Sequence, residues 1–404
     1  MVRKLKHTEI GDIPVDWELQ TFDETFRVMS NNTLSRENLN NRGGAVRNIH
    51  YGDILTKFPE VLDCSEDEIP FVNDLSLLSS STQLLQDGDI VVADTAEDET
   101  VGKVIEVQNL GDSKLVAGLH TIPCRVKKGD FAPGWLGYYM NSDLFHNQIL
   151  PYITGIKVSS ISKGAISETL ILVPPFDEQE KIVQSLNKIQ LLMTAETKVV
   201  NKIKLVKNGC LSKMFPQKDD TVPEIRLPGF TEAWEQCKLS DVVDSVDTGK
   251  SKFDKEGSSG EYPILGSTSV IGYDDEYDYE GDFILTARVG ANAGSLYRHA
   301  GKVKISDNTV YIQASQNIEF LYQLLIRFDI KRLSFGTGQP LVKASELKRL
   351  ELMMPTDMEE QMRIGVYFKN LDHLITLHQR KCDKYSSIKK GMMSDLLTGK
   401  IRLV

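Results

Sequence analysis

The chain has 404 residues, enough for two or three domains, because single hydrophobic cores stop growing near about 250–300 residues. Hydrophobic residues make up 41% and charged residues 26% of the chain, which is ordinary for a soluble globular protein and gives no indication of function. The net charge of −10 at pH 7 argues, taken as a total, against a partner as anionic as nucleic acid.

Neither a targeting segment nor a metal site is predicted. The N-terminal stretch MVRKLKHTEIGDIPVDW lacks the apolar core of a signal peptide, and the chain has no run of about 18 apolar residues. We therefore expect a cytoplasmic protein without a membrane span. The cysteines are odd in number and scattered, so we expect reduced thiols that bind no metal; they are Cys64, Cys124, Cys210, Cys237 and Cys382.

The first predicted domain, residues 1–175, is a mixed α/β globule. Runs such as DIVVAD at 89–94 and TLILVP at 169–174 are rich in β-branched residues and lie between Gly, Asn and Asp. This pattern predicts short strands joined by turns. An aromatic-rich stretch around Trp135 predicts a short helix.

A long helix is predicted at 176–215. From Ile182 onward, apolar residues recur in alternating steps of four and three, which is the spacing of a coiled-coil seam. The preceding VPPFDEQ places acids at the helix N-terminus, where the dipole favours them, and the following MFPQ ends the helix. Residues 216–229 are then a linker.

The same order is predicted again in the second half of the chain. Residues 230–356 form a second globule, with strand-like runs DFILTA at 282–287 and NTVYIQ at 308–313 and a helical stretch around Tyr322. A second long helix covers 357–397, and residues 398–404 form a C-terminal tail.

The two long helices repeat one another at an offset of 182 residues, which carries Glu178-Gln179 to Glu360-Gln361. The predicted seam residues are Ile182, Leu186, Ile189, Met193, Val200, Ile203, Ile364, Phe368, Leu371, Ile375 and Tyr385. A single apolar stripe of this length needs a partner, and the simplest partner is the other copy. We therefore predict an α+β fold in which two α/β globules alternate with two long helices, paired as an antiparallel coiled coil about a pseudo-two-fold axis.

The antiparallel arrangement brings Glu196 near His378; the alternative is that both are solvated where the seam opens. About 36 residues at about 1.5 Å each make a rod of about 54 Å. The rods match in register, whereas segments 31–58 and 247–273 share little. A duplicated chain of this kind is suited to hold two different readers at a fixed separation.

Catalytic and cofactor motifs are absent from the sequence. DSVDTGKS at 244–251 ends like a phosphate loop, but Asp244 occupies the position of the first glycine. The histidines show no zinc-ligand spacing, and no amino-methyltransferase motif occurs. The acidic run DDEYDYEGD at 274–282 is interpreted as a solvated loop, with metal-dependent phosphodiester chemistry as the alternative. We expect a non-catalytic chain with no cofactor or metal site of its own.

Residues able to contact nucleic acid occur in the variable loops. DNA is read by Arg, Lys, Asn and Gln side chains on base edges and phosphates, and binding residues are often placed on loops. The candidates are Arg36, Arg42, Arg47, Asn48, Lys57, Lys157 and Lys163 in the first globule and Lys250, Lys252, Arg288, Asn292, Arg332, Gln339 and Lys343 in the second.

The chain resembles the specificity subunit of type I restriction-modification enzymes over essentially its whole length. The resemblance lies in the Trp-led start of each half, in GTGQPLVKASELKRLELMMPTDMEEQMRI and in the closing IKKGMMSDLLTGKIRL. The first copy departs from this pattern, with TGIKVSSIS where the second has TGQPLVKAS. Gln339 therefore has no glutamine counterpart.

The resemblance implies the fold, the partners and the division of labour. Each globule would be a target-recognition domain for one half of a bipartite site in double-stranded DNA, and the paired helices would act as a ruler. A rod of about 54 Å would cap the separation of the half-sites near about 16 base pairs. Two methyltransferase subunits would supply S-adenosylmethionine chemistry, and motor-nuclease restriction subunits would supply ATP- and Mg-dependent cleavage.

Two alternatives remain open at this point. A recognition subunit of a type IIB-like enzyme shares the architecture but partners a fused nuclease-methyltransferase. A coiled-coil adaptor would use the helices for assembly and never contact DNA.

Overall fold

The computed structural model describes residues 4–155, 157–252, 259–333 and 340–403. The chain forms two compact units: unit 1 comprises residues 1–195 and 382–404, and unit 2 comprises residues 196–381. Each unit therefore combines one globule with one part of each long helix. The compact units cut across the linear domain boundaries expected from the sequence, because contacts along the helices tie both helices to each globule.

Unit 1 is built on a five-stranded sheet of order β4-β13-β9-β11-β7 and a four-stranded sheet of order β12-β6-β8-β5. Its strands are β1 Leu5–Thr8, β2 Gly11–Pro14, β3 Glu18–Thr21, β4 Phe26–Val28, β5 Leu39–Asn40, β6 Val46–Ile49, β7 Val61–Asp63, β8 Phe71–Val72, β9 Ile90–Ala93, β10 Thr95–Ala96, β11 Val104–Gln108, β12 Lys114–Ala117, β13 Thr121–Val126, β14 Ser159–Ser160 and β15 Leu170–Val173. Its short helices are α1 Phe22–Thr25, α2 Tyr51–Thr56, α3 Trp135–Tyr139, α4 Asp143–Ile149 and α5 Lys163–Ser167, with 3-10 turns at Arg36–Asn38, Leu75–Leu77 and Leu150–Tyr152.

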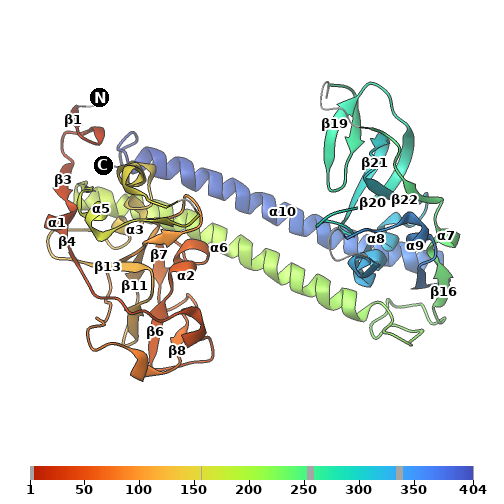
Figure 1. Ribbon diagram of the computed structural model, residues 1–404, viewed down its shortest axis with the longest axis horizontal. Helices are drawn as coiled ribbons and strands as arrows, with labels where there is room; N and C mark the ends of the chain where they lie inside the picture. Colours follow the sequence, from red (N-terminus) through yellow and green to blue (C-terminus); the bar gives the residue numbers. More distant parts are fainter. Residues whose placement is uncertain (1–3, 156, 253–258, 334–339, 404) are drawn as a thin grey trace. The chain divides into compact units, whose positions relative to one another are not determined.

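Unit 2 is built on a six-stranded sheet of order β17-β22-β20-β21-β18-β19. Its strands are β16 Glu235–Lys238, β17 Ser245–Thr248, β18 Tyr262–Leu265, β19 Val270–Asp274, β20 Tyr279–Ala287, β21 Leu296–Ile305, β22 Thr309–Gln313 and β23 Glu351–Met354. Its short helices are α7 Leu239–Val242, α8 Ile318–Phe328 and α9 Ala344–Lys348, with a 3-10 turn at Ile330–Leu333. Helix α8 packs against β20 and β21 (Figure 1).

The two long helices are α6, Phe176–Lys213, and α10, Met358–Leu396 (Figure 1). The α+β fold class predicted from the sequence is confirmed, with both globules mixed and both helices present. The echo between the halves is also visible in the strands that frame each globule. β3 pairs antiparallel with β15 in unit 1, and β16 pairs antiparallel with β23 in unit 2.

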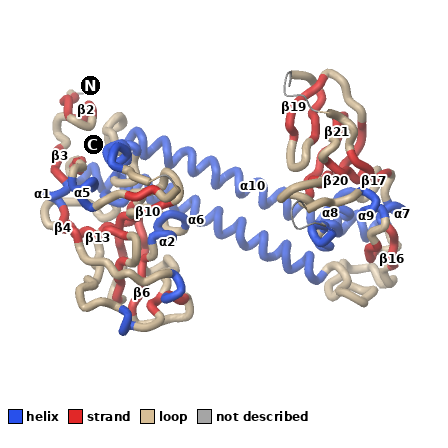
Figure 2. The backbone as a smooth tube through the Cα atoms, in the orientation of Figure 1, coloured by secondary structure: helices blue, strands red, loops and turns tan. Residues whose placement is uncertain are grey.

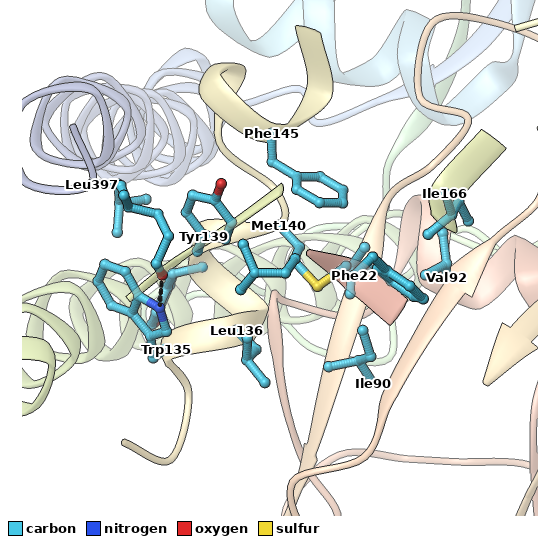
Figure 3. Close-up of a cluster of buried hydrophobic side chains, with 14 of the residues drawn as sticks. Phe22, Ile90, Val92, Trp135, Leu136, Tyr139, Met140, Phe145, Ile166 and Leu397 are labelled. Atoms are coloured by element: carbon cyan, nitrogen blue, oxygen red, sulfur yellow. Dashed lines mark hydrogen bonds between the residues drawn. The ribbon is translucent and has the colours of Figure 1, made fainter. Parts of the chain in front are cut away.

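The core of unit 1 is aromatic and recruits the end of α10. Trp135 lies stacked against Tyr139, and its indole N–H donates to the carbonyl oxygen of Leu172 over 3.1 Å. Figure 3 shows this bond, with Leu397 near the Trp135 side of the cluster and Phe22 and Ile90 on the far side. All six residues are almost completely buried, so this core fixes the end of α10, through the adjoining Leu397, onto the globule.

The long helices contact one another in the antiparallel sense, and the residues predicted for their seam are shielded from solvent. Within unit 2, contacts between α6 and α10 run antiparallel, since Lys207 binds Asp372 at 2.6 Å and Cys210 contacts Tyr367 at 3.2 Å. The side chains predicted for the seam are all buried or half-buried: Ile182, Leu186, Ile189, Met193, Val200, Ile203, Ile364, Phe368, Leu371, Ile375 and Tyr385.

Glu196 and His378 form an ion-pairing hydrogen bond within unit 2, as the antiparallel register suggested. Lys381 lies 3.4 Å from the other oxygen of the Glu196 carboxylate. The hydrogen bond from His378 holds the pKa of Glu196 below its ordinary value, with a smaller contribution from Lys381. Because the folded pKa lies below the unfolded one, this pairing stabilises the fold above the unfolded pKa and is lost as pH falls through the folded pKa.

In the variant His378→Ala we expect the pKa of Glu196 to rise toward its ordinary value of 4.5. The variant Lys381→Ala should raise it less, because His378 is the dominant cause. A carbon-13 NMR titration of the Glu196 carboxyl group measures both changes. An unchanged Glu196 titration in His378→Ala would show that the two side chains are separately solvated.

The repeated Glu-Gln pair at the start of each long helix anchors that helix to its globule. In unit 1, the Glu178 carboxylate accepts from the Trp17 indole at 2.9 Å and from the Arg402 guanidinium at 2.7 Å. In unit 2, Glu360 accepts two bonds from Arg226 at 2.7 and 2.8 Å. The C-terminal tail in unit 1 and the linker after α6 in unit 2 therefore have the same role: each supplies the arginine that binds the buried glutamate.

The glutamines of the two pairs donate to backbone carbonyls in the loops before the long helices, and Gln179 also binds the loop before α3. Gln179 accepts from the Ala132 amide at 3.0 Å and donates to the Pro174 carbonyl at 2.8 Å. Gln361 donates to the Pro355 carbonyl at 2.8 Å. Both acids and both glutamines are buried, so the motif that marks the repeat in the sequence is a structural anchor.

Candidate nucleic-acid interface

In unit 2, basic residues predicted from the sequence gather around the turn between β21 and β22. The Ser251 amide donates to the Ile305 carbonyl at 3.0 Å, which places Lys250 and Lys252 on either side of this contact. Arg288 follows β20 directly, and its guanidinium donates to the carbonyl of Asp307 at 3.4 Å. The side chains of Lys250, Lys252 and Arg288 are exposed.

A second loop brings further candidates to the same edge of the unit 2 sheet. The Val342 amide donates to the Arg288 carbonyl at 2.8 Å, so the exposed Lys343 lies next to Arg288. Asn292 is exposed in the turn between β20 and β21. Arg332 is 74% exposed and lies 3.5 Å from Asp329. Gln339 lies outside the described residues.

In unit 1, three of the predicted basic residues are tied to the protein itself. Arg36 binds the Asp53 carboxylate at 2.7 Å, Arg47 donates to the Cys64 carbonyl at 2.6 Å, and Lys57 donates to the Glu68 carbonyl at 2.5 Å. These bonds fix the loops around β6, β7 and α2. Of the three, Arg36 and Lys57 keep 51% and 41% of their side-chain surface exposed, enough to meet a phosphate.

Asn48, expected from the sequence to contact DNA, is fully buried. Its side-chain oxygen accepts from the Asn32 amide at 2.7 Å, and Asn32 also donates to the Ala117 carbonyl at 2.8 Å. Asn48 is therefore linked through Asn32 to the end of β12, and its side chain has no surface that a ligand could contact. Three other candidates are exposed on loops or at a helix start: Arg42, Lys157 and Lys163.

The strand ends at this part of the unit 2 sheet have topological equivalents in unit 1. β13 lies antiparallel to β9 with Thr121 opposite Ala93, and β22 lies antiparallel to β20 with Thr309 opposite Ala287. The residue after each of these alanines is Asp94 in unit 1 and Arg288 in unit 2.

One backbone bond defines a matching pair in each unit. The Asp94 amide donates to the His120 carbonyl at 3.1 Å, and the Arg288 amide donates to the Asn308 carbonyl at 3.0 Å. We call Asp94 with His120, and Arg288 with Asn308, the strand-end pairs. Reasoning from the sequence identified only Arg288 among the four. The usable signal was position: Asp94 and Arg288 directly follow a buried β-branched run, and His120 and Asn308 directly precede one.

The strand-end pair of unit 1 is surrounded by hydrogen-bonding and aromatic groups. The Thr95 hydroxyl donates to the Asp94 carboxylate at 2.8 Å and lies 3.3 Å from the His120 ring nitrogen. The ring of Tyr51, at the start of α2, meets the His120 ring edge-on at 5.2 Å, and α2 lies beside β10 (Figure 2). Burial lowers the pKa of the neighbouring His50, with Arg36 adding to the effect.

Acidic residues between β19 and β20 contact other parts of unit 2, since the Asp278 carboxylate accepts from the Ser251 hydroxyl at 2.7 Å. Asp274 pairs with Lys304 at 2.9 Å, and this contact lowers the pKa of Asp274. Lys302 lies over the ring of Tyr277 at 4.7 Å. Over the described part of the chain, no group of three His, Cys, Asp or Glu side chains is placed to hold a metal ion. No described helix is long and apolar enough to cross a membrane.

Comparison with known proteins gives one consistent result. Residues 14–205 and 231–384 match the family model for the type I restriction modification DNA specificity domain. One relative is the putative type I restriction enzyme MjaX specificity subunit of Methanocaldococcus jannaschii. It is 24% identical over 426 residues, which cover 98% of this chain and 96% of that protein. The MjaVIII specificity subunit of the same organism is 25% identical, covering 62% of this chain and 66% of its own length.

A solved structure shares the fold. The S subunit of a type I restriction-modification system from M. genitalium aligns over 98% of this chain and 99% of its own, with a TM-score of 0.63 at 14% identity.

Proposed function

The chain belongs to the type I restriction-modification DNA specificity family and is a specificity subunit of such a system, and we propose that each of its units reads one half of a bipartite site in duplex DNA. The paired helices α6 and α10 set the gap between the halves. The chain itself is non-catalytic in this proposal.

The main support for this proposal is that the two units share one backbone framework but carry different side chains at the equivalent strand ends. Both units use the same strand ladder, the same backbone bond at the strand end and the same helix anchor. The side chains at the equivalent edge differ, however, from Asp94 in unit 1 to Arg288 in unit 2. A scaffold repeated with unlike surfaces fits recognition of two unlike sequences.

The basic residues around the unit 2 edge supply phosphate contacts in this proposal. Lys250, Lys252 and Lys343 are exposed beside Arg288, and ammonium groups bind phosphate without regard to sequence. The chain's net charge of −10 opposes tight binding by the isolated subunit. We therefore expect strong binding only in the assembled complex, where partner subunits add positive surface.

The long helices offer a surface for partner subunits. Besides the buried seam, α6 and α10 expose a second set of large apolar side chains: Leu191, Leu192, Val199, Leu205, Val206, Met362, Val366, Leu374, Leu377 and Ile388. Leu205 is 73% and Leu191 69% exposed. Exposed apolar patches mark association surfaces, and we propose that these side chains contribute to such surfaces in each unit.

We assign this second set to two methyltransferase subunits, one for each repeat. These subunits supply S-adenosylmethionine chemistry. Motor-nuclease restriction subunits add ATP- and Mg-dependent cleavage.

The proposal is tested by producing the chain with its neighbouring methyltransferase gene in a host without DNA methylation and mapping modified bases by single-molecule sequencing. We expect a bipartite motif with a fixed unspecified gap. A stable complex that modifies no DNA would instead support an adaptor role, and a single undivided motif would contradict the assignment of one half-site to each unit.

A further inference from the structure

The two strand-end pairs have opposite hydrogen-bonding character at one equivalent position of the fold. Asp94 presents a carboxylate, which only accepts hydrogen bonds, whereas Arg288 presents a guanidinium, which only donates them. Their partners differ too, with His120 in unit 1 and Asn308 in unit 2. All four side chains reach the surface, with 27% of Asp94 and 44% of His120 exposed.

The unit 1 pair lies on a turn whose conformation is fixed by several side-chain hydrogen bonds. His120 has a φ of 56°, a left-handed conformation that is uncommon for residues other than glycine. The Asn31 side chain donates to the carbonyls of Gly118 and Thr121, each at 3.0 Å, and the Thr121 hydroxyl donates to Gly118 at 2.5 Å. Strained residues fixed in this way cluster at functional sites.

The unit 2 pair is flanked by cations and fixed through its backbone. The carbonyl of Asn308 accepts from the Arg288 amide and from the Ser267 hydroxyl, the latter at 3.2 Å. Both side chains of the pair are exposed. The backbone of Arg288 is thus fixed, and its guanidinium, which contacts the Asp307 carbonyl at 3.4 Å, remains exposed to meet a base edge, with Lys250 and Lys343 beside it for phosphates.

We propose that the strand-end pairs are the base-reading centres of the two units. In the major groove, arginine pairs with O6 and N7 of guanine, asparagine with N6 and N7 of adenine, and a carboxylate accepts from N4 of cytosine. Arg288 therefore reads a guanine in one half-site. Asp94 reads a base that presents an amino group, cytosine before adenine, in the other half-site. This inference rests on the proposed function.

A carboxylate at this position favours discrimination over affinity. Asp94 is repelled by every phosphate of any duplex and gains a hydrogen bond only where an amino group meets it. Opposite a base without that group, the carboxylate loses water and keeps only its contacts within the protein, with the Thr95 hydroxyl at 2.8 Å and the His120 ring at 3.5 Å. This desolvation is the repulsive element that specificity requires. Arg288, by contrast, is attracted to all DNA and selects through its two-bond geometry with guanine.

The test compares methylation motifs of the reconstituted complex carrying Asp94→Asn or Arg288→Ala. Asp94→Asn keeps the size of the side chain and a carbonyl oxygen for Thr95, so folding is expected to be retained, as circular dichroism would verify. We expect each variant to lose preference at one base pair, on the order of 10- to 100-fold, with the two variants affecting different halves. Lys127→Ala and Lys348→Ala, which remove exposed cations elsewhere on each unit, should leave the motif unchanged.

The outcomes separate this inference from the proposed function. If the wild-type complex gives no bipartite motif, the proposed function fails and the base assignment fails with it. If the wild-type motif is bipartite but neither variant alters it, or both variants alter the same half, only the strand-end assignment is overturned. Loss of all methylation by a folded variant that still binds its partners would also overturn it, since the pairs would then serve binding rather than discrimination.

Discussion

Replacing Glu360 by alanine is expected to lower the free energy of unfolding of unit 2 by about 3–5 kcal/mol, because it strands the Arg226 charge in a buried site. Glu360 is completely buried and Arg226 keeps only 13% of its side chain exposed. The bond to Glu360 raises the pKa of Arg226 in the wild-type protein. Even without that bond a guanidinium keeps its proton, so Arg226 cannot relieve the loss by becoming neutral. Hydrogen exchange of the α10 amides, read by mass spectrometry, measures the change.

The matched control is Glu359→Ala, which removes an exposed carboxylate one residue earlier. That variant should change exchange little, since surface charges contribute about 0–1 kcal/mol. A second comparison is Glu178→Ala, the equivalent change in unit 1, whose effect should be confined to unit 1. Equal protection in Glu360→Ala and Glu359→Ala would mean that the Glu360–Arg226 contact does not anchor the helix.

Lengthening both long helices by one heptad is expected to widen the unspecified gap of the recognised site by about three base pairs. Seven residues add about 10.5 Å of helix, and successive base pairs are about 3.4 Å apart. Duplicating residues 189–195 in α6 and 371–377 in α10 extends the two helices at equivalent positions and keeps the seam in register. Both half-sites should stay the same, because neither globule is altered.

The control for this change is the insertion in α6 alone. One lengthened helix shifts its seam against the other by two turns, so Lys207 loses Asp372 and the apolar contacts no longer match. Methylation should then be lost. A double insertion that retains activity with an unchanged gap would contradict the role of the helices as a spacer.

The long helices were predictable because their signal is local and repeated. Apolar residues that recur in alternating steps of four and three over about ten turns all lie on one face of a helix. The same spacing in the second copy supports the helix predicted from the first. Two lysines, Lys207 and Lys389, occupy the next positions of the same spacing and interrupt its apolar pattern. Each finds an acid within its own unit, Asp372 for Lys207 and Glu60 for Lys389, the latter at 2.5 Å.

The anchor of each helix was only half visible in the sequence. The repeated Glu-Gln pair was recognised, but its partners Arg226 and Arg402 were not. They lie in matching Ile-Arg-Leu segments, 225–227 and 401–403, at a different offset from that of the helices. A search at one fixed offset could not find them, because the linker and the tail differ in length.

The reading surface was the least predictable part. Counting Arg, Lys, Asn and Gln in variable loops selected Asn48, which is buried, and missed Asp94 and His120. Whether a loop residue is buried depends on strand pairings far apart in sequence, such as β6 with β12. A rule based on residue type also overlooks acids, although a carboxylate can read an amino group.

The measurement that tests the central claim most directly is the methylation motif of a chimaera. Residues 26–161, from the start of β4 to the end of the loop before α5, would be replaced by the equivalent segment of another family member of known motif. The Glu178 anchor and the helices would be kept. If each unit reads one half-site, one half of the motif changes to that of the donor, while the other half and the gap stay the same. A chimaera that folds and modifies DNA with both halves changed, or with neither changed, would contradict the claim.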